Sequence, residues 1–257
     1  MSTGRRREAP PGVGVVLACA LACYALAQLA LAYLVGFVGN VGVPGSIDSG
    51  PAGATASALA VDLGLVALFG LQHSVMARPG AKARLLRVVP AALERAVYVA
   101  ASAAALLAIF ALWRPLPEPV WSVAHPAARA ALWGLFVGGW GVAVAATFAI
   151  DHFELFGLRQ AWRHRRAEPH VPAPFQTPAL YRMVRHPMQL GTLLGLWATP
   201  AMSRGHLLFA GAMTVYVLVG LRLEERDLVR TFGDRYRAYQ ARVPMLIPRW
   251  PRLRERG

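Results

Sequence analysis

Residues 13–38 read VGVVLACALACYALAQLALAYLVGFV, an apolar run that contains no charged side chain. A run of 18 or more such residues is long enough to cross a bilayer as an α-helix. It is too long for the hydrophobic core of a signal peptide, and no clear small-residue cleavage site follows it, so we expect it to be retained. The run therefore predicts a membrane-spanning first helix.

Similar apolar runs recur along the chain, which has 257 residues, 56% of them hydrophobic. The mean hydropathy of +0.42 lies well above that of soluble proteins. No linker or internal repeat divides the sequence, which predicts a single all-α, polytopic membrane domain over residues 1–257. We expect about five to six transmembrane helices, at about 13–38, 55–76, 91–113 and 127–150, with shorter runs at 188–200 and 205–221.

The two shorter runs are separated only by PAMSRG. At 1.5 Å per residue, a helix over the first of them is only about 20 Å long, against about 30 Å for the hydrocarbon core. We therefore predict a tight C-terminal helical hairpin, and whether it crosses the membrane completely is left open.

The basic residues predict the orientation of the helices. Of the 27 Lys and Arg residues, 24 lie in the N-terminus, the loop after the second segment, the stretch 157–187 and the tail from Arg222. Only Arg114, Arg129 and Arg204 lie on the opposite side. This asymmetry predicts six crossings with both termini in the cytoplasm, in a membrane of the bacterial inner-membrane type. Because the basic residues flank apolar helices and no nucleic-acid motif accompanies them, we expect no nucleic-acid partner.

Two polar features inside the apolar segments have simple structural interpretations. Cys19 and Cys23 lie one helical turn apart, which favours small packing residues over a disulfide or a metal site. Asp62 lies in the middle of the second segment, where a carboxylate is costly. It is eleven residues before His73, about 16 Å along a helix, so we expect an interhelical polar contact rather than a catalytic role.

Ionisable groups collect at the predicted cytoplasmic ends of four segments. Single cations there are explained by snorkelling to the interface, but four helix ends with ionisable groups at one depth favour a functional site. The four groups are His73, Asp151–His152–Phe153–Glu154, the stretch LYRMVRHPMQLG (180–191), and Arg222 with Glu224, Glu225 and Arg226.

The stretch 180–191 has the features of an anion site. Pro187 follows His186, and proline is favoured at the first position of a helix. His186 is thereby predicted to lie at a helix N-terminus, whose positive end attracts a carboxylate, and Arg185 adds a further charge. Glu224 and Glu225 are predicted to close the returning helix, where they suit a cation or an amine. A ligand that carries a carboxylate and an ammonium group, such as S-adenosylmethionine, fits both ends, although spacing alone does not single it out.

The motif YRMVRHP, followed by a hairpin and by EERDLVRTFGDRYRAYQARVPMLIP, resembles the isoprenylcysteine carboxyl methyltransferase superfamily of membrane enzymes. The shared pattern is RHP, then EE, then FG-(D/E)-x-Y-x-x-Y-x-x-x-V-P. Within this superfamily the chain looks most like the methanethiol S-methyltransferases, which are related to nurim. Supporting segments, from about residue 60 onward, include LQHSVMARPG (71–80), FAIDHFELFGLRQAW (148–162) and PFQTPALYRMVRHP (174–187).

The resemblance implies transfer of a methyl group from S-adenosylmethionine to methanethiol, which gives dimethyl sulfide. It places the cofactor at the cytoplasmic face, in a portion covering about 151–250. The chain departs from many superfamily members in having Gln189 where they have a tyrosine, which puts an aromatic cofactor contact in doubt. The cofactor-binding residues implied by the resemblance and by the helix-end argument are Gln160, Phe175, Gln176, Tyr181, Arg185, His186, Pro187, Gln189, Glu224 and Glu225.

Methylation of a thiol requires the thiolate, because the thiolate is the nucleophile. His73 is our preferred general base, since histidine titrates near neutral pH; His152, Asp151 and Glu154 are alternatives. Alternatively, His73 has only a structural role, as a histidine at a helix end that is hydrogen-bonded to a backbone carbonyl. Another small thiol, a phospholipid or an isoprenylcysteine remain possible acceptors, as does a non-catalytic, nurim-like membrane protein. Oligomeric state and the general base are not determined by the sequence.

Overall fold

The computed structural model describes residues 12–51, 54–169 and 175–248. Among these residues, five helical stretches are long and apolar enough to cross a membrane. The all-α membrane fold is therefore confirmed, and the ends of the first four predicted segments differ from the structure by one residue at most. The five are α1 (Val13–Gly39), α2 (Thr55–Met76), Ala91–Leu112 formed by η1 (Ala91–Leu93) and α4 (Glu94–Leu112), α5 (Pro126–Ile150) and α9 (Arg204–Phe232).

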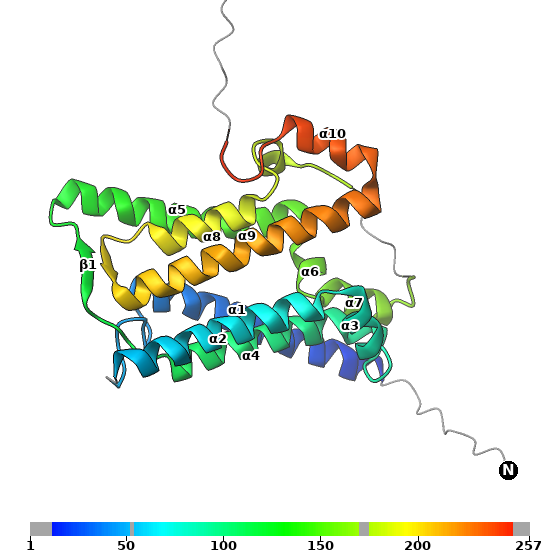
Figure 1. Cartoon of the computed structure of the whole chain (residues 1–257). Helices are drawn as coiled ribbons and strands as arrows, with labels where there is room; N and C mark the ends of the chain where they lie inside the picture. The colour runs from blue at the N-terminus through cyan, green and yellow to red at the C-terminus, as the bar shows by residue number, and fades with distance from the viewer. Residues whose placement is uncertain (1–11, 52–53, 170–174, 249–257) are drawn as a thin grey trace, which may run out of the picture.

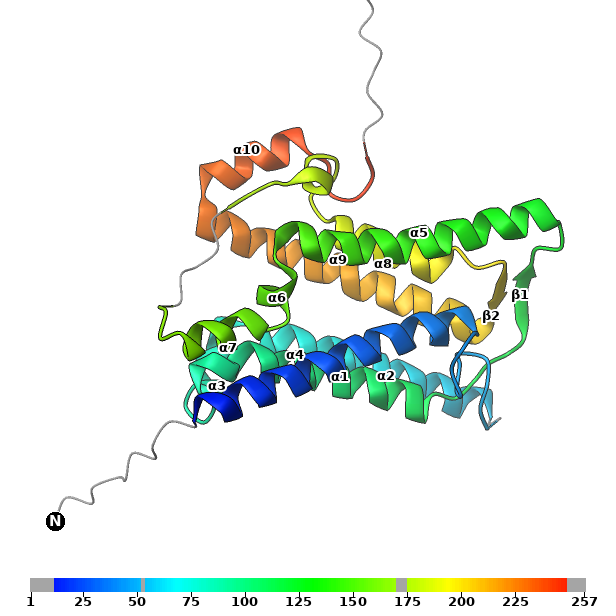
Figure 2. The ribbon, with the colours of Figure 1, turned by 180° about the vertical axis from the view of Figure 1, so that it is seen from behind.

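The long helices lie in two layers (Figures 1 and 2). In the first layer α1 and α2 pack on α4, and in the second α5 packs on α8 (Pro187–Trp197), which lies beside α9. The layers are joined chiefly where α2 packs on α9. The start of α1 and the end of α9 lie at the same end of the bundle (Figure 1). We call this the basic end; Arg5, Arg6 and Arg7 lie outside the described residues.

Short elements occupy both ends of the bundle. At the opposite end, β1 (Pro119–Ser122) and β2 (Ala201–Ser203) form an antiparallel pair in which Trp121 lies across from Met202. This sheet was not predicted, because three or four residues are too few to show an alternating pattern. The basic end carries α3 (Pro79–Leu85), α6 (His152–Leu155), α7 (Leu158–Arg165), η2 (Ala179–Arg182) and α10 (Asp234–Arg242).

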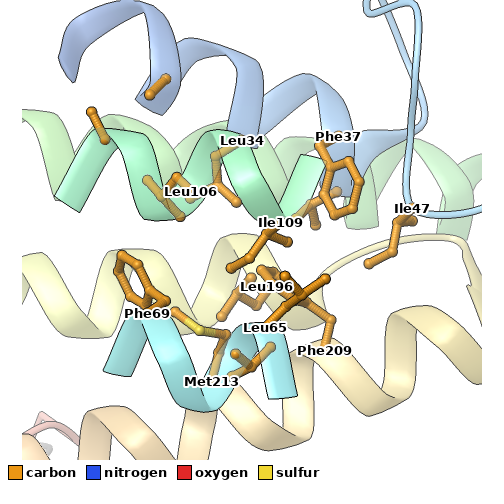
Figure 3. Close-up of a cluster of buried hydrophobic side chains, with 14 of the residues drawn as sticks. Leu34, Phe37, Ile47, Leu65, Phe69, Leu106, Ile109, Leu196, Phe209 and Met213 are labelled. Atoms are coloured by element: carbon orange, nitrogen blue, oxygen red, sulfur yellow. The ribbon is translucent and has the colours of Figure 1, made fainter. Parts of the chain in front are cut away.

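The two layers meet in an apolar core toward the opposite end (Figure 3). Phe37, Leu65 and Ile109 of the first layer belong to the same buried cluster as Leu196 and Phe209 of the second. Between membrane helices such contacts stabilise through van der Waals packing, because lipid is as apolar as the side chains. The core therefore fixes the layers against each other from the end that carries the sheet, and the same cluster continues to Phe156 near the basic end.

Glycines allow α5 and α8 to approach each other closely. A Cβ atom at Gly139 would lie 2.8 Å from the carbonyl oxygen of Gly191 and 2.8 Å from the nitrogen of Gly195. Small residues at such positions let two membrane helices touch through their backbones. This contact holds the first turns of α8, and with them His186, against α5.

The predicted C-terminal hairpin differs from the structure in one important respect. The second run was predicted to end near 221, but α9 has 29 residues and continues to Phe232. The apolar run ends at Leu221, whereas the following Leu, Glu and Arg residues still favour a helix, which stops only at Gly233 with φ of 56°. Glu224 and Glu225 therefore lie within the helix and do not close it.

The first helix of the hairpin is short, as expected. α8 has 11 residues, and the extended stretch 198–203 that follows leads on to the sheet (Figure 1). Among the described residues α8 is not one of the five candidate spans, so whether the hairpin crosses the membrane completely stays an open prediction.

Asp62 and the two cysteines, the polar features inside the apolar segments, have the structural roles that the sequence predicts. Asp62 is fully buried, and its Oδ1 accepts the backbone N–H of Arg114 at 2.9 Å. This confirms the expected polar contact between segments. Cys19 and Cys23 are free thiols, as expected.

Candidate functional site

The RHP segment and the EE pair meet at the basic end. Nε of Arg185 donates to Oε1 of Glu225 at 2.6 Å, and Nε2 of His186 lies 3.1 Å from the same oxygen. The side chains of Arg185, His186 and Glu225 are only 11%, 5% and 13% exposed. These three groups form a largely buried ion-pair cluster, which we call the RHE cluster.

The chain after α9 supports the RHE cluster. Nε2 of Gln240 donates to the second carboxylate oxygen of Glu225 at 3.1 Å. Nη1 of Arg185 donates to the carbonyl oxygens of Gln240 and Val243. The backbone N–H groups of Arg185 and His186 donate to the carbonyls of residues 244 and 245. Both oxygens of Glu225 are therefore engaged within the protein, so Glu225 has a structural role.

Glu224 differs from its neighbour because it points in another direction on α9. Met213, Val217, Gly220 and Glu224 follow one another at steps of four, three and four residues, so they share one face of the helix. Met213 and Val217 are buried between the layers, whereas Glu224 is exposed. A Cβ atom at Gly220 would meet no atom within 4 Å. This face of α9 is therefore uncovered at Gly220 and Glu224, and we call the space beside these two residues the interlayer opening.

The carboxylate of Glu224 is available to a ligand. Within the described residues it makes no hydrogen bond and no ion pair, and the charges of His186, Glu225 and Arg95 act on it from a distance. Glu224 is therefore the member of the EE pair that is suited to bind a cation.

Aromatic side chains surround the loop before RHP. The ring of Phe175 lies 5.3 Å from that of Phe232 and 5.5 Å from that of Tyr239, and the guanidinium of Arg235 lies 5.2 Å above it. These contacts tie the predicted loop residue Phe175 to α9 and α10. The loop is also attached to α5, because Nε2 of Gln176 donates to the carbonyl of Ile150 at 3.2 Å.

Tyr181 is buried under this loop. Its hydroxyl donates to the carbonyl of Ala146 at 3.4 Å, and its own carbonyl accepts from the hydroxyl of Tyr239. Burial raises the pKa of Tyr181, and the negative charge of Glu224 raises it further. Burial also raises the pKa of Tyr239 to about 12, against the opposing charge of Arg185. Both hydroxyls therefore remain protonated donors near neutral pH.

The start of α8 lies next to the RHE cluster in the sequence. Pro187 is buried and begins the helix, and the N–H groups of Met188 and Gln189 have no carbonyl partner within a helix that starts there. The amide of Gln189 is partly exposed and makes no hydrogen bond to any described residue. This helix start therefore offers donors to an anionic group.

Three predicted bases lie together at the end of α5 and in α6. The hydroxyl of Thr147 donates to a backbone carbonyl, so it accepts from Nδ1–H of His152 at 2.8 Å, and Nε2 of His152 accepts from the hydroxyl of Tyr24 at 2.9 Å. Burial lowers the pKa of His152, opposed by the charge of Asp151. Asp151 pairs with an arginine of α7 at 2.8 Å, and Glu154 lies 3.8 Å from Arg163. All three predicted bases thus make contacts within the protein.

Gln160 lies at the edge of an open, charged cavity. Its Oε1 accepts the backbone N–H of Arg95 at 3.3 Å. Two adjoining cavities of about 300 and 290 Å³ share Lys82, Glu94 and Gln160 among their lining residues. Asp151 and Glu154 line the second one. The cavities bring Gln160 and two of the predicted acids to the same surface.

His73 lies between the layers, in a defined hydrogen-bond chain. The hydroxyl of Ser102 donates to the carbonyl of Tyr98 at 3.0 Å, so it accepts from Nδ1–H of His73, also at 3.0 Å. Nε2 of His73 then carries a lone pair, and the hydroxyl of Tyr98 donates to it at 2.7 Å. The expected alternative, a bond from His73 to a backbone carbonyl, is not the contact found, because both ring nitrogens bond to hydroxyls.

Several residues of the site were missed in the sequence. Arg95, Tyr98 and Ser102 recur every three or four residues along α4, so they share one helix face that also bears apolar residues. Their spacing was a signal, but it is the same as that of ordinary packing residues. Gln240 lies in the polar tail, and nothing in its surroundings distinguishes it.

The fold and site define a class of polytopic membrane protein with an interlayer opening at the basic end. Residues 63–247 match the model of the NnrU protein family. No solved structure matches the chain. A methanethiol S-methyltransferase of Mycobacterium tuberculosis is 47% identical over 90% of this chain and 94% of its own length. That of Pseudomonas deceptionensis is 52% identical over 82% of this chain and 80% of its own length.

Nurim of Homo sapiens is a more distant relative, 34% identical over 66% of this chain and 68% of its own length. The chain belongs to the NnrU protein family and, within it, to the methanethiol S-methyltransferases.

Proposed function

We propose that this protein is an integral membrane methyltransferase that uses S-adenosylmethionine to methylate methanethiol, with dimethyl sulfide as the product. The supporting observation is the carboxylate of Glu224, which lies at the interlayer opening beside the RHE cluster and makes no hydrogen bond or ion pair with any residue that the structure describes. The relatives that match most of this chain are named for the same activity.

The residues at the opening fit a ligand that carries both charges of an amino acid. Glu224 suits the ammonium group, because an ionised carboxylate forms a strong hydrogen bond to a cation. The start of α8 at Pro187 suits the carboxylate, whereas the charge of Arg185 is paired with Glu225. The remaining proposed contacts are Gln160, Phe175, Gln176, Tyr181, His186 and Gln189, with Glu225 acting through Arg185 and His186.

S-adenosylmethionine, when bound, supplies an electrophilic methyl group on a positively charged sulfur. The protein contributes orientation of donor and acceptor, which gives much of the rate in a displacement of this kind. Met213 and Val217, on the same face of α9, are buried and apolar, which limits access of water to the site from the core side.

We further propose that the basic end faces the cytoplasm of a bacterial-type inner membrane. All basic residues of α3 and α7 lie at that end, and positive charge is retained on the cytoplasmic side. The site would then open toward the compartment that contains the cofactor.

The test is headspace analysis of membranes that contain the protein, supplied with methanethiol and methyl-labelled S-adenosylmethionine. The proposal predicts labelled dimethyl sulfide from the wild type and from Glu118→Gln, a matched change at an exposed glutamate of the opposite end. Glu224→Gln should lose most of the activity.

Two results would overturn the proposal. Full activity of Glu224→Gln would show that the cofactor is held elsewhere. A wild type that binds S-adenosylhomocysteine but makes no dimethyl sulfide would show that the acceptor is a different thiol, a phospholipid or a prenylated cysteine.

A further inference from the structure

The Tyr98–His73 pair borders the interlayer opening from the first layer. The charges of Glu224 and Arg95 both act on the hydroxyl of Tyr98, and the guanidinium of Arg95 lies 4.9 Å from the centre of its ring. His73 lies edge-to-face with Tyr216 of α9 at 6.3 Å, and Tyr216 is one helical turn before Gly220. Tyr98 and His73 are therefore close to the space beside Gly220, on the side opposite α9.

The proton positions in this pair determine what it can accept. Nδ1 of His73 carries its proton toward Ser102, and Nε2 already receives the hydroxyl of Tyr98. A thiol therefore cannot reach a free ring nitrogen. The hydroxyl of Tyr98, in contrast, can donate one hydrogen bond and accept another at the same time. A proton that leaves a ligand in this space reaches His73 through Tyr98.

Resting on the function proposed above, we propose that the acceptor thiol binds beside Gly220 with its S–H against the hydroxyl of Tyr98, and that Tyr98 and His73 together take its proton. The S–H bond breaks and a new O–H bond forms on Tyr98 while the original hydroxyl proton moves to Nε2 of His73. The sulfur electron pair forms the new S–CH₃ bond as the methyl–sulfonium bond of the donor breaks. His73 is left as an imidazolium, which returns its proton to solvent after product release.

Gly220 sets the size of this acceptor site. A Cβ atom there would meet nothing within 4 Å, so the space beside residue 220 is free of protein atoms, and a longer side chain at this position would occupy it. The same face of α9 is buried at Met213 and Val217, which closes the site toward the opposite end.

The molecule contains a matched control for this pair. Tyr24 and His152 form the same arrangement: the hydroxyl of Thr147 accepts from Nδ1–H of His152, and the hydroxyl of Tyr24 donates to its Nε2. However, His152 is buried, and its ring stacks on that of Phe148 at 4.1 Å. Tyr24→Phe therefore removes an equivalent hydrogen bond away from the proposed acceptor site.

The experiment compares two thiols with wild type, Tyr98→Phe and Tyr24→Phe. Methanethiol needs a base, whereas the more acidic 2,2,2-trifluoroethanethiol is extensively ionised at pH 8. Removal of a general base costs roughly 100- to 10,000-fold in rate. Tyr98→Phe should therefore lose about that factor in kcat with methanethiol, but less than about 10-fold with the acidic thiol, with unchanged affinity for S-adenosylhomocysteine. Tyr24→Phe should retain both rates.

A second variant tests the position of the thiol independently of the proton. Gly220→Leu should raise KM for methanethiol more than Gly220→Ala does, while both retain affinity for S-adenosylhomocysteine.

Three results would overturn the proposal. The first is an equal fall in kcat with both thiols in Tyr98→Phe, which would indicate that Tyr98 has a packing role. The second is a fall in kcat in Tyr24→Phe that is larger with methanethiol than with the acidic thiol, which would indicate that His152 is the base. The third is an unchanged KM in Gly220→Leu. A wild type that methylates neither thiol would instead refute the function proposed above.

Discussion

Exchange of each glutamate of the EE pair for glutamine should produce opposite defects. Glu225→Gln removes the negative charge of the RHE cluster and leaves Arg185 buried without a counter-charge. Breaking a buried pair in this way costs about 3–5 kcal/mol. The lower end applies, because Arg185 keeps its bonds to the carbonyls of Gln240 and Val243. For a chain of this size, about 3 kcal/mol corresponds to a fall in Tm of roughly 6–12 °C.

Glu224→Gln should leave the Tm nearly unchanged, because this carboxylate makes no hydrogen bond or ion pair within the described residues. It should instead weaken ligand binding. The loss of one hydrogen bond to a charged group costs about 1.5–3 kcal/mol, or roughly 10- to 150-fold in Kd.

The assay is thermal unfolding of the purified protein in lipid nanodiscs, with and without S-adenosylhomocysteine, and Glu118→Gln as the control. The reasoning predicts a low Tm that still rises with ligand for Glu225→Gln, and a normal Tm that hardly responds for Glu224→Gln. If Glu224→Gln is the less stable variant, or if both behave alike, the assignment of separate roles is wrong.

Three further predictions concern stability. Gly139→Ala should lower stability by about 1–3 kcal/mol through overpacking against α8. Gly138→Ala, whose Cβ meets nothing within 4 Å, should not lower it, because alanine favours a helix more than glycine does; both are measured by thermal unfolding. Arg78→Ala should cost less than about 1 kcal/mol, since the side chains of Arg78 and Asp227 are 38% and 45% exposed, and a larger loss would contradict this. Burial holds the pKa of His152 below its unfolded value of about 6.5. The stability that neutral His152 contributes is therefore present above that pH and is lost as the pH falls. Thermal unfolding at pH 7.5 and at pH 5 should show a smaller loss of stability in His152→Gln than in the wild type.

The long helices could be predicted from the sequence because their signal is local. Residues 13–38 and 55–76 are long, predominantly apolar runs, and a bilayer permits few structures other than a helix for such a run. The end of α9 could not be found in this way, since hydropathy marks where a helix leaves the membrane, at Leu221, and not where the helix ends. The β1–β2 pair depends on residues far apart in the chain, such as Trp121 and Met202, which are 81 positions apart, and has no local signal.

The candidate site was predictable only to the level of residue type. The pattern located both members of the EE pair, but their separate roles depend on direction around α9 and on Gln240 from the tail. His73 was selected as a base, yet the role of Tyr98 follows from the hydroxyl bond of Ser102, which fixes the tautomer. Such hydrogen-bond chains depend on the packing of α2 on α4, so they cannot be predicted from the spacing of residues in the sequence.

The unequal attachment of the two layers has a mechanical consequence. The apolar core and the strand pair hold them together at one end, and Tyr216 of α9 packs on Phe69 and His73 of α2 further along. Beyond this contact, the Arg78–Asp227 pair between the layers is exposed to water. A helix of 27 residues such as α1 is about 40 Å long. A tilt of only about 5° with its pivot at the strands therefore moves the far ends by about 3.5 Å, roughly one van der Waals contact distance. We therefore expect a small change of packing near Phe209 to alter the width of the space beside Glu224.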